Sequence, residues 1–390
     1  MRDTVPEQAA WFPPGYAPPT RVVYGEGALD QVGEATRELG GRRVLLVTDP
    51  GLEEAGHARR AQVALETAEL EVFVFDGVRE NPTTHHVEAG AETAAQHQVD
   101  FLVAVGGGSA MDCAKGINFL YTNGGPMARF QGNGRAEKPM LPSLAVPTTA
   151  GTGSEGQSYA LIADAKTHVK MACGDKKCAF RVAILDPLVT LSQPAKVTAL
   201  TGIDAISHAL ESHVCTRRND LSQALSRSAW KLLDPNLPRV LRHPADLKAR
   251  AAMQVGAHLA GVAIENAMLG AAHACANPLT AVFGLTHGHA VGIMLPWVIR
   301  FNAEAVASLY AELDGDLEDA GSFETAPERL AQRVTALLEE AELPVRLGDI
   351  GISASSLPSL AEKALNQWTV RFNPRPLDQQ AILRLYTAAL

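Results

Sequence analysis

The sequence predicts an α/β domain followed by an all-helical domain. Short apolar runs at 44–47 and 101–105 alternate with helical patterns through the first half of the chain. Such runs are expected of strands in a mostly parallel sheet that is buried on both faces. After Pro194 the patterns become long and helical, and no convincing strand follows. We therefore predict a sheet domain at residues 1–194 and a helical domain at residues 195–390.

The first domain contains strand and helix patterns in alternating order. Residues 1–20 hold five prolines and are expected to form an irregular arm. Apolar runs predict strands at 21–24, 44–47, 70–75, 101–105 and 182–185, and the apolar segment 144–147 leads into a loop. Helical patterns occupy 28–39, 86–96 and 110–121. This alternation is typical of a parallel sheet, and the boundary with the second domain falls near 192–196.

Composition and charge argue against several classes of protein. The chain has 390 residues, of which 46% are apolar and 20% charged, as in an ordinary globular protein. The formal net charge of −9 and the lack of a basic run argue against nucleic acid and anionic membranes as partners. There is no long apolar run, no signal-peptide core and no paired cysteine motif among the five cysteines. We therefore expect a cytoplasmic protein without a membrane span.

Two loops of the first domain have the composition of ligand-binding segments. The predicted strand at 101–105 runs directly into Gly106-Gly-Gly-Ser109 and then into a helix. A glycine turn between a strand and a helix lets backbone N–H groups approach a phosphate, although a tight turn without ligand is the alternative. The segment 148–155 is rich in small and hydroxylic residues, so it either lines a ligand cleft or forms a plain surface loop.

The segment from Gly202 to His287 contains candidate metal ligands. Asp204 and His208 are four residues apart, so in a helix both side chains lie on one face. His273 lies late in a helical pattern at 247–275, and His287 begins a third segment. One carboxylate and three imidazoles suit zinc or ferrous iron better than magnesium or calcium. The alternatives are a hydrogen-bonded core pair and ordinary core histidines. Other helical patterns lie at 222–233, 303–313 and 326–341.

Five ordered motifs carry a resemblance to a known family. Residues 106–116 read GGGSAMDCAKG, 147–155 PTTAGTGSE, 202–211 GIDAISHALE, 273–279 HACANPL and 286–288 THG. Residues 373–376, NPRP, resemble a further C-terminal segment. From about residue 20 to residue 390, the chain resembles the iron-containing (group III) alcohol dehydrogenases, which share the dehydroquinate synthase-like fold. The resemblance implies a Rossmann-like N-terminal domain, a helical C-terminal domain and an active site between them.

The resemblance also implies the site residues and the reaction. One divalent ion, iron or zinc, is expected on the catalytic residues Asp204, His208, His273 and His287. The expected cofactor contacts are Asp49, Asn81, Gly107, Gly108, Ser109, Thr148, Thr149 and Lys170. A carboxylate at position 49 repels a 2′-phosphate, so NAD is favoured over NADP. The implied reaction is metal-assisted hydride transfer between an alcohol and an aldehyde or ketone, in a homodimer or higher homo-oligomer.

Some positions depart from the family pattern and leave alternatives open. Asn277 stands where most relatives have a second histidine, and His289 and Gln157 are also unusual. We expect a water chain or His289 to replace the missing histidine in proton transfer. Glu211 is expected either beside the ligands or in a solvated or interface position. The alternative functions are a dehydroquinate synthase-like lyase, a specialised reductase of an oxo-acid or phosphonate aldehyde, and a non-catalytic binding protein.

Overall fold

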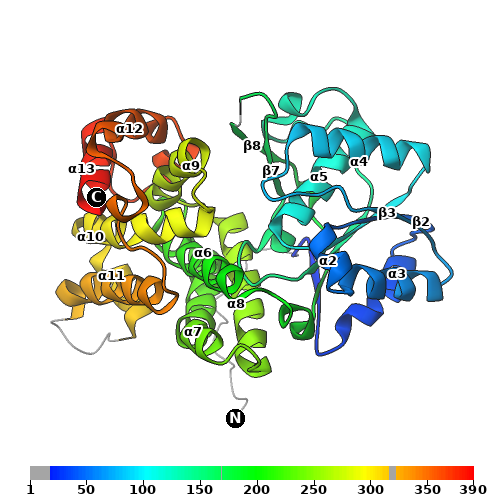
Figure 1. The fold of residues 1–390 in the computed structure, drawn as a ribbon, viewed down its shortest axis with the longest axis horizontal. Coiled ribbons are helices and arrows are strands. Elements are labelled where there is room, and N and C mark those ends of the chain that lie inside the picture. Colours follow the sequence, from blue (N-terminus) through cyan, green and yellow to red (C-terminus); the bar gives the residue numbers. More distant parts are fainter. Residues whose placement is uncertain (1–17, 168, 316–321) are drawn as a thin grey trace, which may run out of the picture.

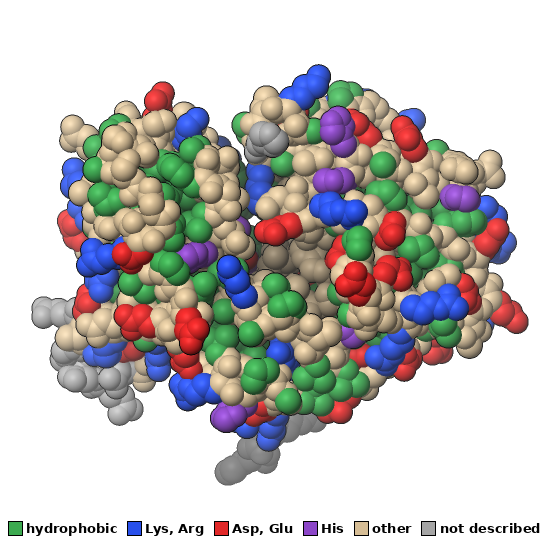
Figure 2. Space-filling view, in the orientation of Figure 1, with side chains coloured by type: hydrophobic (Ala, Val, Ile, Leu, Met, Phe, Trp, Pro, Cys, Tyr) green, Lys and Arg blue, Asp and Glu red, His purple; other side chains and the backbone are tan. Residues whose placement is uncertain are grey.

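The computed structural model describes residues 18–167, 169–315 and 322–390, which form two lobes (Figure 1). One lobe contains the sheets and the helices around them, and the other consists of helices. The predicted fold class is therefore confirmed. Most of the predicted N-terminal arm, residues 1–17, lies outside the described residues. Figure 2 shows a notch between the two lobes at the upper edge of the molecule.

The main sheet has six parallel strands in the order β1-β9-β6-β4-β2-β3. They are β1 (Arg21–Tyr24), β2 (Arg43–Val47), β3 (Glu71–Phe75), β4 (Phe101–Gly106), β6 (Ser143–Pro147) and β9 (Val182–Leu185). Successive residues of β2 pack on opposite faces: Leu45 belongs to the core that includes Val87, whereas Leu46 belongs to the core that includes Leu65. The continuous apolar runs are thus those of strands buried on both faces.

Helices cover both faces of this sheet. They are α1 (Val32–Glu38), α2 (Pro50–Glu54), α3 (His57–Thr67), α4 (Thr84–Gln96) and α5 (Gly108–Asn123). The structure adds elements that the sequence patterns did not predict, namely α2, α3 and a second sheet. That sheet contains β5 (Gly132–Asn133), β7 (Tyr159–Ala163) and β8 (Lys170–Gly174), with β7 and β8 antiparallel. Both β7 and β8 are partly exposed, unlike β4 and β6 of the main sheet, which are buried throughout.

The helical lobe contains eight α-helices among its described residues. They are α6 (Ala195–Val214), α7 (Asp220–Arg242), α8 (Leu247–Asn266), α9 (Ala271–Phe283), α10 (His287–Asp314), α11 (Ser322–Glu340), α12 (Leu357–Leu365) and α13 (Gln379–Ala389). The prediction of one helical segment at 247–275 was wrong, because α8 and α9 meet at a bend of 105°. Ala267 (φ −135°, ψ −122°) and Gly270 (φ −133°, ψ −137°) leave the helical region there. His273 therefore lies in the first turn of its own helix.

Helix α10 is long and apolar enough to cross a membrane by length and composition alone. Most of its apolar window is nevertheless buried inside the protein, where it packs against α6, α9 and α11. The predicted helix at 303–313 is the second part of α10, which is kinked at Val306 (φ −142°, ψ 28°). The apolar character of α10 is thus that of a core helix.

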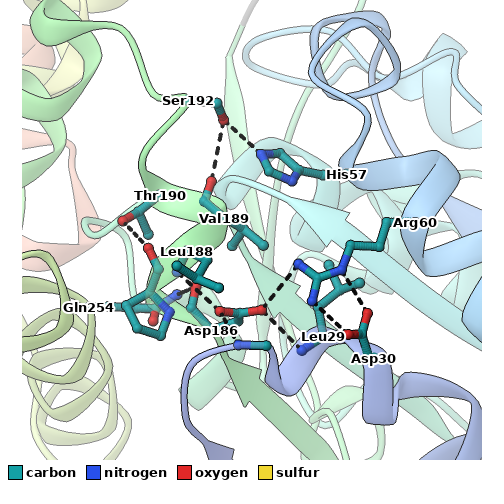
Figure 3. Close-up of polar contacts among 12 residues, drawn as sticks. Leu29, Asp30, His57, Arg60, Asp186, Leu188, Val189, Thr190, Ser192 and Gln254 are labelled. Atoms are coloured by element: carbon teal, nitrogen blue, oxygen red, sulfur yellow. Dashed lines mark hydrogen bonds and ion pairs between the residues drawn. The ribbon is translucent and has the colours of Figure 1, made fainter. Parts of the chain in front are cut away.

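The carboxylate of Asp186 organises the point where the chain leaves the main sheet (Figure 3). Its Oδ1 accepts hydrogen bonds from Gly27 N and Leu188 N, both at 3.0 Å, and its Oδ2 accepts one from Leu29 N at 3.2 Å. The guanidinium of Arg60 lies 3.6 Å from Oδ2. These contacts compensate a fully buried charge and fix the end of β9 before the chain enters the helical lobe.

Helix α8 makes the closest contacts between the lobes. Gln254 donates to the carbonyls of Pro147 and Asp186, and Glu265 accepts hydrogen bonds from Ser158 N and Oγ. Nδ1 of His258 lies 3.2 Å from Glu155 Oε1, and both side chains are buried.

Between these contacts the two backbones nearly touch. A Cβ added to Gly261 would lie 2.3 Å from the carbonyl oxygen of Gly153. Only glycine permits this approach, which seats the 148–155 loop directly on α8.

Candidate metal and cofactor site

Helix α6 carries the first two candidate ligands into the core. Asp204 and His208 are one turn apart, and Nε2 of His208 lies 3.4 Å from Asp204 Oδ1. Ile203, Ala205 and Ile206 are fully buried and hold this helix in the middle of the lobe. Helical periodicity places both polar side chains on one face, as the sequence predicted.

Two other helices bring the remaining histidines to the same carboxylate. Nε2 of His273, in the first turn of α9, lies 3.5 Å from Asp204 Oδ1. Nε2 of His287, the first residue of α10, lies 3.8 Å from the same atom. Asp204, His208 and His273 each offer a ligand atom within 4.8 Å of the others. His287 lies at the edge of this group, and 26% of its side chain is exposed.

The polar atoms of this group fit a metal ion. Asp204 Oδ1 and His273 Nε2 are buried and make no hydrogen bond. A buried polar atom without a partner is costly, and an ion between these atoms would satisfy them. A hard carboxylate oxygen with imidazole nitrogens suits Fe²⁺ or Zn²⁺.

Burial and the neighbouring carboxylates act in opposite directions on the pKa values of the rings. Burial alone lowers the pKa of His273, but contacts with Asp204 and Glu211 outweigh it and raise that pKa to about 9. Burial lowers the pKa of His287 to about 3, and the positive charge of Lys170 acts in the same direction. Although burial opposes ionisation of Asp204, the neighbouring imidazoles hold the pKa of Asp204 below its usual range. The site therefore keeps its carboxylate ionised.

Glu211 decides the orientation of His273. Its Oε2 lies 2.6 Å from His273 Nδ1, and its Oε1 accepts a hydrogen bond from Ala272 N at 2.7 Å. Because Nδ1 is engaged by the carboxylate, Nε2 points toward Asp204. Of the positions that the sequence left open for Glu211, the structure shows the buried one beside a candidate ligand.

The predicted cofactor residues follow the carboxyl ends of neighbouring parallel strands. Asp49 follows β2, Gly107 to Ser109 follow β4, and Thr148 and Thr149 follow β6. The chain moves from β2 to β3 on one side and to β4 on the other, so β2 and β4 flank the switch point where such sheets bind ligands. Asp49 also caps α2 through Leu52 N at 3.2 Å.

The glycine turn and the 148–155 loop are in close contact. A Cβ added to Gly107 would lie 3.1 Å from the Thr149 side chain, and one added to Gly108 would lie 2.6 Å from that of Thr152. Helix α5 begins at Gly108, and its N-cap Gly107 provides no side-chain cap. Unpaired N–H groups in the first turn are suited to bind an anion.

Lys170 and Asn81 lie outside the strands that flank the switch point. Lys170 begins β8, where burial lowers its pKa while the carboxylates of Asp112 and Asp204 act in the opposite direction. The positive charge of Lys170 therefore acts electrostatically on the candidate metal ligands. Asn81 has a left-handed backbone (φ 53°) and precedes α4. Electrostatic coupling to Asp204 and His287 thus links Lys170 of the sheet lobe to the candidate ligands of the helical lobe.

Two polar residues of α5 were missed although both lie in a quoted motif. Lys115 of α5 is 1% exposed and donates to Ser154 O, Ser154 Oγ and Tyr159 O at 2.7–2.8 Å. Asp112, also of α5, accepts a hydrogen bond from the same Ser154 hydroxyl at 2.7 Å. These bonds fix α5 to the 148–155 loop. Their signal was the spacing of Asp and Lys three residues apart after the glycine turn.

The unusual residues are held by neighbours other than the candidate metal ligands. Asn277 Nδ2 donates to Gln367 Oε1 at 3.0 Å, and Gln157 Nε2 donates to Thr152 O at 2.8 Å. His289 lies in the first turn of α10, with Nε2 2.8 Å from Pro344 O. The expectation that His289 stands in for the missing histidine is therefore contradicted, because a helical start at His287 turns position 289 away from the site.

The chain matches known proteins over nearly its whole length. Residues 19–187 match the model described as iron-containing alcohol dehydrogenase, and residues 198–390 match the C-terminal model of the same family. A 1,3-propanediol dehydrogenase of Citrobacter freundii is 35% identical over 379 residues, with 96% of this chain and 98% of that protein covered. An NAD-dependent methanol dehydrogenase of Bacillus methanolicus is 33% identical, with 96% and 99% covered.

A solved structure gives the same result. The crystal structure of a 1,3-propanediol oxidoreductase has a TM-score of 0.91 at 33% identity, with 95% of this chain and 98% of that chain covered. The likeness therefore extends through both the sheet lobe and the helical lobe. With both family models matched in order along the sequence, the chain belongs to the iron-containing alcohol dehydrogenases, a family of metal-dependent oxidoreductases.

Proposed function

We propose that this protein is an NAD-dependent alcohol dehydrogenase or aldehyde reductase whose four metal ligands are Asp204, His208, His273 and His287. The carrying observation is that three imidazole Nε2 atoms from three helices lie 3.4, 3.5 and 3.8 Å from one buried carboxylate oxygen. Both Fe²⁺ and Zn²⁺ suit this donor set. A bound ion would supply Lewis acidity that acidifies the alcohol, and the nicotinamide of NAD would accept the hydride.

The chain's own groups position the reactants. The first turn of α5, with Gly107, Gly108 and Ser109, binds the pyrophosphate through backbone N–H groups. Thr148, Thr149 and Asn81 border the cofactor, and Lys170 supplies a positive charge near the ligands. Asp49 accepts from the adenosine ribose and disfavours a 2′-phosphate, so NAD is preferred over NADP. The buried walls around Asp204 exclude water from the reacting centre.

The proposed function also suggests the domains, the oligomeric state and the cellular compartment of the protein. We propose a cofactor domain at residues 1–194 and a metal domain at residues 195–390. Among the residues that the structure describes, the first strand, β1, pairs with β9 alone and exposes Val22 and Tyr24. An open edge of this kind supports a homodimer or higher homo-oligomer, because a second copy would cover it. All five cysteines are free and buried, which supports the reducing cytoplasm as the compartment.

A specialised reductase is the second candidate. The guanidinium groups of Arg217 and Arg371 lie 5.7 and 4.8 Å from the centre of the Phe372 ring. Trp368 stacks on Tyr159 at 5.9 Å and follows Gln367, which bonds Asn277 one turn beyond His273. These two exposed guanidinium groups beside Phe372 would favour an aldehyde that carries a carboxylate or phosphonate.

One experiment tests both candidates. Protein loaded with Fe²⁺ or Zn²⁺ is assayed with a panel of alcohols, simple aldehydes, oxo-acids and phosphonate aldehydes, and NADH absorbance is followed. Steady NADH formation from alcohols supports the first candidate, and preference for anionic aldehydes supports the second. No turnover with any substrate in the metal-loaded protein, or full turnover after complete metal removal, would overturn the proposal.

A further inference from the structure

The N-terminus of α9 is capped by side chains from other parts of the chain. Its N-cap residue is Gly270, which provides no side-chain hydrogen bond. The N–H group of Ala271 donates instead to Asn373 Oδ1 at 3.2 Å, and that of Ala272 donates to Glu211 Oε1 at 2.7 Å. The first N–H groups of a helix lack partners within the helix, so these two acceptors do the work of local caps.

Gly270 is needed for this arrangement. A Cβ at position 270 would lie 3.0 Å from Asn373 Oδ1 and 3.1 Å from Glu211 Oε1. These distances are shorter than most contacts of a real Cβ atom, so a side chain there would push both acceptors away. The glycine thus admits two remote caps to one helix end.

Asn373 is itself held by a reciprocal amide pair. Asn302 Nδ2 donates to Asn373 Oδ1 at 3.0 Å, and Asn373 Nδ2 donates to Asn302 Oδ1 at 2.7 Å. Both side chains are buried. Asn373 Nδ2 also donates to Arg375 O at 2.7 Å, and Arg375 donates to Phe301 O at 3.1 Å. The C-terminal segment is therefore fastened to α10 at two neighbouring points.

We propose that Asn373 is a positioning residue for the metal site. Through Ala271 N and Asn302 it joins α9, which carries His273, to α10, which carries His287. Glu211 makes the matching connection from α9 to α6. His273 lies two residues after Ala271, so a shift of this helix end moves the imidazole directly. The inference rests on the proposed role of the four side chains as metal ligands. In it, the C-terminal segment keeps these side chains in the positions that metal binding requires.

The test measures metal affinity rather than turnover. Zn²⁺ binding to the full-length Asn373→Ala variant is determined by competition with a chromophoric chelator, and Co²⁺ absorption reports the ligand geometry. We expect Zn²⁺ affinity to fall by about tenfold, the lower end of the range for groups that orient metal ligands. Asn118→Ala is the matched control. Asn118 is equally buried and bonds Leu141 N and O, but it lies in the sheet lobe.

A second variant tests whether Asn302 affects the metal site through its hydrogen bonds with Asn373. Asn302→Ala leaves the acceptor for Ala271 N in place but removes its support. If Asn302 acts through Asn373, the two substitutions lower Zn²⁺ affinity non-additively when combined. Additive losses, or an Asn373→Ala affinity equal to that of Asn118→Ala, would overturn the inference. Should Asn373→Ala not fold, an unchanged affinity in Asn302→Ala overturns it. A wild-type protein that binds no Zn²⁺ or Co²⁺ instead rejects the proposed metal site itself.

Discussion

Glu211 Oε2 lies 2.6 Å from Nδ1 of His273, although the two residues are 62 positions apart in the chain. The carboxylate fixes the ring and increases the basicity of its other nitrogen. We predict that Glu211→Gln lowers Zn²⁺ affinity by roughly 10- to 100-fold, because the amide gives a weaker hydrogen bond. Chelator competition measures the change. Glu155→Gln is the control, since Glu155 is also a buried partner of a histidine, His258, and its substitution should leave affinity unchanged.

Removing a ligand should abolish turnover and metal binding together. We predict that Asp204→Ala and His273→Ala lose activity and bound metal while far-ultraviolet circular dichroism stays that of a folded chain. The reason is that each removes one donor from the group around Asp204 Oδ1. Metal content and steady-state rates are the measurements. His258→Ala, which removes a histidine of similar burial, should retain its metal. A His273→Ala enzyme with full activity would contradict the assignment.

Cofactor choice should depend on the charge of Asp49 rather than on its capping role. Asp49 accepts from Leu52 N, so Asp49→Gly removes both a charge and a helix cap. Asp49→Asn keeps an acceptor and removes only the charge. We predict that both variants lower the NAD to NADP ratio of kcat/KM about tenfold, equivalent to about 1.4 kcal/mol. A wild-type preference for NADP, or a ratio unaffected by Asp49→Asn, would refute this role.

The proton released in alcohol oxidation should not pass through position 277 in the wild type. Asn277 bonds Gln367 and does not titrate near neutral pH. We predict that Asn277→His introduces a group titrating near neutrality into the pH profile of alcohol oxidation. Profiles are measured between about pH 5 and 10. Asn277→Ala should preserve the wild-type shape, and so should His289→Ala, because the His289 ring bonds Pro344 O. An unchanged profile in a metal-loaded, active Asn277→His enzyme places position 277 off the proton path.

Acid should destabilise the helical lobe through His213. This fully buried residue of α6 bonds Ser226 Oγ at 2.9 Å, and Glu312 and Arg227 lie at its other side. Burial lowers the pKa of His213 to about 3, and Arg227 and Arg218 act in the same direction. The pKa in the unfolded chain is about 6.5, so this residue costs nothing above pH 6.5. Between about pH 6.5 and the folded-state pKa, the unfolded chain binds a proton at His213 and the folded chain does not. The free energy of unfolding therefore falls progressively as the pH falls through this range.

The size of this effect is measurable. Between pH 7.5 and pH 5, the wild type should lose about 2 kcal/mol of unfolding free energy through this one group. His213→Gln should remove that part of the loss, whereas His243→Gln, at an exposed position, should not. Urea unfolding midpoints at both pH values provide the comparison. Equal acid sensitivity in wild type and His213→Gln would show that the buried ring does not govern acid stability.

The sequence patterns predicted best those elements whose burial or function is visible in their own residues. The runs at 44–47 and 101–105 are apolar because their strands are covered on both sides, so burial is visible in the residues themselves. The four candidate ligands were identified because their motifs are short and ordered, and the structure brings them together. The Asp49-Pro50 pair is a typical start of a helix, because Asp caps the first turn and Pro fits the first helical position. This pair could therefore have predicted α2.

Other features depend on contacts distant in the sequence. Gly270 is a local helix-breaking residue, but a single glycine does not reveal the sharp bend that gives His273 a helix of its own. Glu211 looked equally suitable for solvent or core, because its partner lies on another helix. The direction of His289 depends on where α10 begins, which the packing of the lobe determines. Tertiary contacts decide such cases, and local propensity does not.

The remote capping of α9 has a consequence for the synthesis of the protein. All four candidate ligands lie between residues 204 and 287, yet one cap of the helix that carries His273 is Asn373, close to the end of the chain. All four candidate ligands are therefore synthesised before Asn373, the residue that caps the helix carrying His273. Chains truncated before position 373 keep the ligands but lack this cap. The order of synthesis thus places the candidate ligands in the growing chain about ninety residues or more before the side chain that caps α9.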